Sequence, residues 1–165
     1  MTQDRDGAAT RDRIIDVVRE DPGVHKSELC RRLGLGWGTV SYHVRVLEKE
    51  RRLRSWSRGR EVHVFPARVP DGQMRWLAAL REGMGTSIVE TLVRMPDARV
   101  KELSGSLGVS RKVIQRHLTV LDEAGVVRHD GSHQPRYRIE DDTVAALRRL
   151  LTSGPGLDTQ GDKPA

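Results

Sequence analysis

The sequence of 165 residues has little of what disulfide-bonded, membrane-spanning or aromatic-lined proteins require. It contains a single cysteine, Cys30, so no disulfide can form within the chain, as suits a reducing compartment. Aromatic residues make up 4% of the chain, which argues against a large aromatic-lined enzyme pocket. No apolar run approaches the roughly 18 residues of a membrane span, and the polar start lacks the apolar stretch of a signal peptide. We therefore expect a cytoplasmic protein with no membrane partner.

Catalytic and metal-binding motifs are also missing. The sequence contains no phosphate-binding loop, no paired carboxylates in an apolar setting and no nucleophile–base motif, so we do not expect an enzyme. His43 and His117 lack a cysteine or second histidine at ligand spacing, and one thiol makes no soft-metal site. We predict no metal site and no cofactor, and we expect each of these histidines to pack its ring and bond locally.

Positive charge is what the sequence has in excess, and most of it lies in the first half. The formal net charge is +6, with a pI near 10.1. Residues 1–70 hold 15 Lys and Arg against 10 Asp and Glu, a net +5, whereas residues 71–165 hold 14 against 13, a net +1. Such a balance favours an anionic partner, and nucleic acid is the first candidate.

The sequence also repeats itself at a shift of 74 residues. Residues 14–55 align without a gap on residues 88–129, and ten of these 42 pairs are identical, including Gly34 with Gly108 and His43 with His117. A period this long indicates one small domain used twice rather than a solenoid.

Each copy has the same order of predicted elements, which is three helices and then two strands around a tight turn. In the first copy the helices fall within "TRDRIIDVVRED", "KSELCRRLGLG" and "WGTVSYHVRVLEKER", and the turn at Arg58–Gly59. Thr10 is the expected N-cap of the first helix, and Ser110 that of the third helix in the second copy. Three helices and a hairpin make a winged helix-turn-helix. We therefore predict a mainly α fold with small β-hairpin wings, in two tandem winged helix-turn-helix domains.

The predicted boundaries follow the repeat. They are residues 8–70 for the N-terminal winged helix, 71–83 for a linker helix, 84–140 for the second winged helix, 141–152 for a C-terminal helix and 153–165 for a disordered tail.

The two helix-turn-helix segments carry a family pattern. "ELCRRLGLGWGTVSYHVRVLEKERRL" and "KELSGSLGVSRKVIQRHLTVLDEAGVV" both resemble the motif of ArsR/MarR-like winged-helix regulators. Two copies in one short chain resemble the tandem winged-helix predicted transcriptional regulators, mainly archaeal. The resemblance implies a DNA-binding regulator. The first copy departs from the pattern, because Arg51 replaces the glycine before the wing; we expect its third helix to run on by about one residue.

The third helix of each copy has an apolar face and a face that could read DNA. At 100° per residue, Val40, Val44 and Leu47 share the inward face. Between the two copies the inward residues stay apolar, whereas the outward residues differ. This pattern fits two domains that recognise different DNA sequences, one DNA-binding domain with a degraded second copy, or neutral change at the surface. The predicted DNA-contacting residues are Trp37, Gly38, Thr39, Ser41, Tyr42, Arg45 and Lys49 in the first copy, and Arg111, Lys112, Gln115 and Arg116 in the second.

Further contacts are expected from the wings, and Trp37 is a special case. Arg54, Arg58 and Arg60 belong to the first wing and Arg136 to the second, where they can reach phosphates or the minor groove. Trp37 lies between the two helix faces, and its counterpart in the second copy is Arg111. We interpret it as a partly exposed side chain that packs on sugar-phosphate or a base methyl; a core-edge anchor is the alternative.

These observations favour a sequence-specific transcriptional regulator that binds double-stranded DNA, with the first copy contributing most of the affinity. One alternative is a non-specific architectural, chromatin-like protein. Another is a protein-interaction module, for which the nearly neutral second copy is the better candidate. We expect association with the nucleoid. The sequence leaves open the target, any small-molecule effector, the sign of regulation and whether the chain forms a homodimer.

Overall fold

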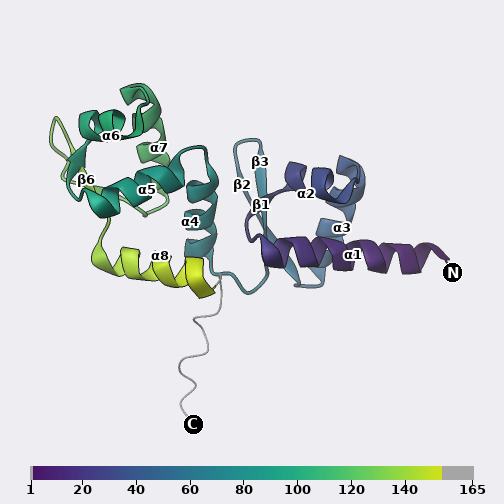
Figure 1. The fold of residues 1–165 in the computed structure, drawn as a ribbon. Helices are drawn as coiled ribbons and strands as arrows, with labels where there is room; N and C mark the ends of the chain where they lie inside the picture. Colours follow the sequence, from purple (N-terminus) through teal and green to yellow (C-terminus); the bar gives the residue numbers. More distant parts are fainter. Residues whose placement is uncertain (1, 154–165) are drawn as a thin grey trace, which may run out of the picture. The chain divides into compact units, whose positions relative to one another are not determined.

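The computed structural model describes residues 2–153, and the side chains of residues 6–152. The chain divides into two compact units that meet between Met74 and Arg75 (Figure 1). Within the described residues, no helix combines the length and the apolar character needed to cross a bilayer.

The N-terminal unit consists of three helices and a small antiparallel sheet. Its strands are ordered β1-β3-β2, and β2 and β3 form a hairpin of six residue pairs. The elements are α1 (Thr2–Glu20), β1 (Val24–His25), α2 (Lys26–Leu33), α3 (Trp37–Lys49), β2 (Leu53–Arg58) and β3 (Glu61–Pro66).

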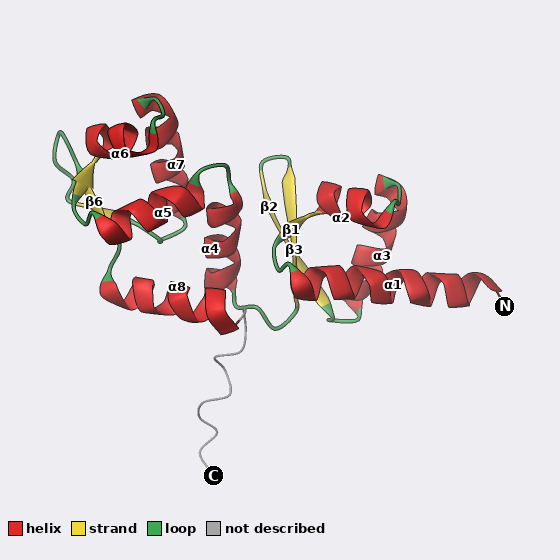
Figure 2. Ribbon diagram, in the orientation of Figure 1, coloured by secondary structure: helices red, strands yellow, loops and turns green. Residues whose placement is uncertain are grey.

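The C-terminal unit repeats this order with shorter strands and has an additional helix at each end (Figure 2). Its sheet is ordered β4-β6-β5, again antiparallel. The elements are α4 (Asp71–Arg81, which begins before the division), α5 (Gly85–Arg94), β4 (Ala98–Arg99), α6 (Val100–Leu107), α7 (Arg111–Glu123), β5 (Arg128–His129), β6 (Arg136–Arg138) and α8 (Asp141–Ser153). Mostly helical units with small antiparallel sheets are consistent with a winged helix-turn-helix.

Each unit has its own apolar core, as the helical periodicity predicts. The inward face of α3 is confirmed, since Val40, Val44 and Leu47 are all at most 1% exposed and pack with α1 and the sheet. In the other unit Ile114 and Leu118 of α7 are fully buried in the equivalent core.

Three left-handed backbone positions recur at the same shift of 74 residues. The pairs are Gly23 with Asp97, Gly34 with Gly108, and Arg51 with Gly125, and all six residues have φ between 56° and 85°. Each copy thus has glycine at two of these three shared positions and a larger residue at the third. The two copies therefore share the same backbone conformation at these positions even where their residue types differ.

Arg51 therefore does not lengthen its helix, contrary to the sequence-based expectation. Helix α3 ends at Lys49 and has 13 residues, as α7 does. Glu50 is the C-cap, and Arg51 takes φ = 56°, which ends the helix just as Gly125 does with φ = 77°. The packing of the strand that follows, starting at the buried Leu53, holds the chain to this path despite the strain.

Thr10 is not the N-cap of the first helix, contrary to the sequence-based expectation. Helix α1 starts at Thr2, and the Thr10 hydroxyl donates to the carbonyl of Asp6 at 2.8 Å within the helix. A threonine hydroxyl can accept from a backbone amide at a helix start or donate to a backbone carbonyl within a helix. The presence of Thr10 alone therefore did not determine where the helix begins. The tail expected to be disordered lies outside the described residues from residue 154 onward.

Candidate nucleic-acid interface

A short turn joins α2 to α3 and sets the direction of α3. Gly34 adopts φ = 65° at the end of α2, and the amide of Leu35 donates to the carbonyl of Cys30 at 3.0 Å. Gly36 is the N-cap of α3 in an extended conformation. Because Gly36 has no side chain to cap the helix, the first amides of α3 are left to partners such as phosphate.

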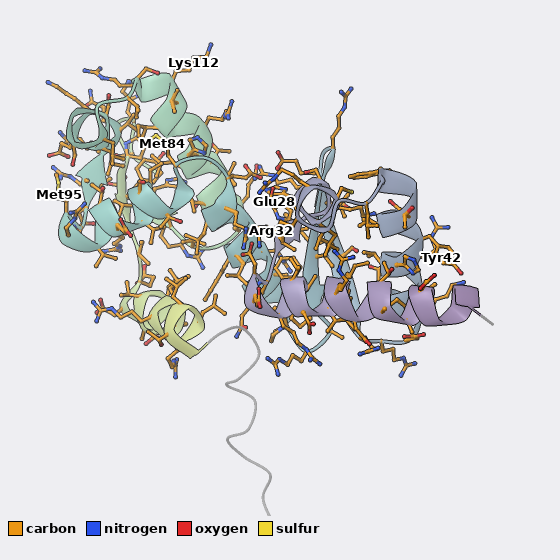
Figure 3. All side chains as sticks on the ribbon, turned by 45° about the vertical axis from the view of Figure 1, so that its right-hand side comes forward. Glu28, Arg32, Tyr42, Met84, Met95 and Lys112 are labelled. Atoms are coloured by element: carbon orange, nitrogen blue, oxygen red, sulfur yellow. The ribbon has the colours of Figure 1, made fainter. Side chains whose placement is uncertain are left out.

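Helix α3 presents most of the predicted contact residues to solvent. Tyr42 is 62% exposed, and it is labelled in Figure 3 on the N-terminal unit. Gly38, Thr39, Arg45 and Lys49 are exposed as well. Gly38, Tyr42, Arg45 and Lys49 lie opposite the buried face of α3. That surface of the helix thus combines an aromatic ring, two cations and a glycine.

Ser41 differs from its neighbours on this helix. Its hydroxyl oxygen is buried and has no hydrogen-bond partner among the residues that the structure describes. The position of Ser41 on the helical wheel predicted that it faces outward. Its short side chain stays close to the helix, however, and its hydroxyl oxygen is shielded from solvent. The hydroxyl is therefore not presented to a base in this conformation.

Trp37 is the first residue of α3 and is 53% exposed, which confirms the expectation of a partly exposed side chain. The ammonium of Lys26, the first residue of α2, lies 5.2 Å from the centre of the indole ring. A cation over a ring at this distance is attracted to it. The two side chains therefore form a flat apolar surface with a positive charge beside it.

The β2–β3 hairpin turns at Gly59 and Arg60, one residue later than predicted. Arg58 pairs with Glu61 across the strands, and Gly59 takes φ = 58°, which glycine adopts easily. Arg60 is exposed at the turn and Arg58 is half-buried. Arg54 is committed elsewhere, because its guanidinium bonds the carbonyl of Val69 at 3.0 Å and forms an ion pair with Asp71.

The arginines of α2 are neutralised by acids. Glu28 accepts hydrogen bonds from Arg31 and Arg32, and Arg32 also pairs with Asp21 at 2.7 Å (Figure 3 labels Glu28 and Arg32). The bonds from Arg31 and then Arg32 lower the pKa of the Glu28 carboxyl to about 2. These two arginines of α2 are therefore engaged by acids of their own unit.

In the C-terminal unit, Ser110 caps α7 as predicted, accepting from the amide of Val113 at 3.4 Å. The four predicted residues of α7 are all exposed; Lys112 is labelled in Figure 3. The structure also shows a groove of about 820 Å³ that the sequence did not indicate. Its polar lining comes from the starts of α6 and α7 and from the hairpin loop: Arg99, Lys101, Glu102, Arg111, Gln115, His133 and Gln134.

The second hairpin loop is held together by one carboxylate. Asp130 accepts from the amide and hydroxyl of Ser132, at 3.1 and 2.8 Å, and from the amide of Arg136 at 3.2 Å. The bonds from Ser132, and then that from Arg136, lower the pKa of Asp130. The guanidinium of Arg136, a predicted DNA contact, donates to the carbonyl of Asp97 at 3.2 Å and so braces the loop.

His43 and His117 are buried at their equivalent positions, 8% and 5% exposed. Burial, and then the nearby Arg11 and Arg116 respectively, lower the pKa of each ring. The expected local bond is missing at Nδ1 of His43, which has no partner within the described part of the chain. Three other residues do come together: His25, Glu61 and His63. Only the pairing of β1 with β3 reveals this cluster, since no local spacing signals it.

Comparison with known proteins identifies a domain type for the N-terminal part of the chain. Residues 8–77 match the family model HTH_HVO_0163_N, an N-terminal HTH domain. Over 121 residues the chain is 29% identical to an uncharacterized HTH-type transcriptional regulator of Methanocaldococcus jannaschii. That alignment covers 72% of this chain but 30% of the relative, so the chain spans less than a third of the relative's length. The N-terminal unit thus contains an HTH domain, and the chain has a distant archaeal relative named as a transcriptional regulator.

Proposed function

We propose that the protein is a transcriptional regulator that binds double-stranded DNA in a sequence-specific manner. The observation that carries the proposal is the solvent-exposed face of α3, where Tyr42, Arg45 and Lys49 stand opposite a completely buried apolar face. The HTH family match over this helix supports it. We also propose that both units are winged helix-turn-helix domains in tandem, of the ArsR/MarR-like type.

In this proposal α3 lies in the major groove and the hairpin turn follows the backbone. Arg45 can bond two acceptors of a guanine at once, and Lys49 can neutralise a phosphate. Trp37 packs on sugar or a thymine methyl at the start of the helix. Arg60 extends the contact at the hairpin turn, whereas Arg54 positions the hairpin through its bonds to Val69 and Asp71.

The C-terminal unit contributes a second, weaker DNA contact. Its groove brings together three cationic side chains, Arg99, Lys101 and Arg111, beside the amides at the start of α7. Such a site suits a phosphate. Glu102, which accepts from the amide of Arg99 at 2.7 Å, reduces the positive charge there. The near neutrality of this half of the sequence agrees with a smaller share of the affinity.

A second candidate role for the C-terminal unit is self-association. Helices α5 and α8 line an apolar groove of about 390 Å³ with Val89, Val93 and Val144 among its walls. Leu151 at its edge is 66% exposed. Large exposed apolar side chains beside a groove are common at protein interfaces. Light scattering tests this role. If the groove mediates self-association, the wild type is expected to have a larger mass in solution than Leu151→Glu, and equal masses would contradict it.

The contact roles are tested by fluorescence anisotropy with a labelled duplex. Arg45→Ala is expected to weaken binding to a preferred sequence by about 1–3 kcal/mol and to random duplex by less. Arg60→Ala is expected to weaken both equally and to lower the salt slope by about 0.9. Arg149→Ala, which removes an exposed arginine of α8, is the matched control and is expected to bind as wild type does. Unchanged binding by both test variants would overturn these roles.

A further inference from the structure

A row of ring side chains crosses the sheet of the N-terminal unit. His25 of β1 and His63 of β3 are directly paired in the antiparallel ladder, and their ring centres lie 4.2 Å apart. Trp56 of β2 pairs with His63 from the other side, at 5.9 Å. Paired residues point to the same face of a sheet, so β3 holds His63 between two other rings.

A carboxylate lies near the two imidazoles. Glu61 precedes His63 by two residues on β3, which puts both on the same face of the strand. One potential ligand atom from each of His25, Glu61 and His63 lies within 4.8 Å of the other two. Two imidazoles and a carboxylate are a common ligand set for zinc and similar divalent ions.

The orientation of His63 fits a metal ligand. The ring is fully buried, and its Nδ1 lies 3.0 Å from the carbonyl oxygen of Gly23. A carbonyl only accepts, so Nδ1 carries a proton, and in the neutral form of the ring Nε2 then has the lone pair that a metal needs. Metal-binding histidines are typically held in this way, with the second ring nitrogen donating to a carbonyl.

The exposure of the other two side chains leaves room for the cluster to close around an ion. Bonds of about 2.0–2.1 Å in a tetrahedron put ligand atoms roughly 3.3 Å apart, so the cluster must contract from its 4.8 Å limit. His63 is fixed, but Glu61 is exposed and His25 is half-buried, so both can rotate toward it. Three protein ligands leave a fourth position for water.

We propose that His25, Glu61 and His63 bind one divalent transition-metal ion of the zinc class. The C-terminal unit provides an internal comparison, because there Arg99 of β4 pairs with Arg136 of β6 where the first unit pairs His25 with His63. Two guanidinium groups offer no lone pair to a metal. One ion per chain is therefore expected.

A metal at this place would connect the helix-turn-helix to the hairpin. His25 is the N-cap of α2, and Glu61 directly follows the hairpin turn at Gly59 and Arg60. The ion would tie these segments together and add positive charge beside Arg60. The expectation that zinc strengthens DNA binding rests on the proposed function, whereas metal binding itself does not.

The metal test uses the tag-free full chain after treatment with a chelator. Calorimetric titration with Zn²⁺, and visible absorption with Co²⁺, are expected to show one site in the wild type. His25→Gln and Glu61→Gln are expected to weaken it on the order of tenfold or more. His133→Gln, which removes an exposed histidine of the other unit, is the control and is expected to bind as wild type does. Circular dichroism verifies that each variant is folded without metal.

The outcomes separate the two parts of the inference. Absence of a wild-type site, or equal binding by His25→Gln and Glu61→Gln, overturns the metal site while leaving any DNA binding intact. If the site is present, Zn²⁺ is expected to tighten wild-type binding to duplex DNA but not that of Glu61→Gln. Metal binding with unchanged DNA affinity overturns the coupling alone.

Discussion

Replacing Arg51 with glycine is expected to stabilise the N-terminal unit, because Arg51 adopts φ = 56°. A residue with a Cβ in this conformation loses roughly 1–2 kcal/mol relative to the right-handed region. Glycine avoids that strain but loses about 0.5–1 kcal/mol more entropy on folding. The difference predicts a gain of about 0.5–1 kcal/mol in the free energy of unfolding, or about 3–6 °C in Tm for a domain of this size.

The equivalent position in the second copy allows the opposite substitution, from glycine to a residue with a Cβ. Gly125 has φ = 77° at the equivalent position, and a Cβ added there would meet nothing within 4 Å. Gly125→Ala therefore tests backbone strain without a steric clash, and we expect a loss of similar size from the C-terminal unit. Arg51→Ala removes the charge but keeps the strain, so it is expected to leave the Tm close to that of wild type.

Differential scanning calorimetry of the three variants is the assay. Arg51→Gly is expected to raise the Tm of one transition, and Gly125→Ala is expected to lower the Tm of the other. A lower Tm for Arg51→Gly would contradict the assigned backbone strain, since contacts of the arginine side chain would then outweigh it.

Three further expectations concern stability and exposure. Because burial lowers the pKa of His43 and His117 below the 6.5 of the unfolded chain, the unfolded state takes up protons first as the pH falls. Stability is therefore fully present above pH 6.5 and declines below it; guanidinium unfolding at about pH 7.5 and pH 5.5 should show a smaller decline in the His43→Gln/His117→Gln variant. Ser110→Ala should lower the unfolding free energy by about 1 kcal/mol through loss of the α7 cap, as urea titration can measure. Quenching of tryptophan fluorescence by acrylamide should fall when duplex DNA binds, and a Trp37→Phe variant should lose this protection; equal protection in the variant would contradict the role of Trp37.

The helices and their inward faces could be predicted because helical periodicity is a local property. Val40, Val44 and Leu47 recur at the spacing of one helix face, and only a core can bury such a stripe. The exposure of Trp37 could also be predicted, because the repeat places Arg111 at the equivalent position and an arginine is rarely deeply buried. Local pattern was sufficient wherever one helix face decided the outcome.

Other features depended on contacts between distant segments. The strand register that pairs His25 with His63 has no signature in either segment alone. The same holds for Arg54 and its bond to the Val69 carbonyl, and for the covered hydroxyl of Ser41. At Arg51 the tertiary path overrode the intrinsic preference of the residue, which no propensity rule anticipates.

The central claim, that α3 reads DNA sequence, is tested most directly by selection from a random pool of DNA duplexes. The wild-type chain is expected to enrich a defined motif, and Arg45→Ala is expected to enrich the same motif with one position relaxed. Recovery of unselected duplex, with a specificity ratio near one, would contradict the claim and favour a non-specific architectural protein. An unchanged motif for Arg45→Ala would contradict the assignment of base reading to this residue.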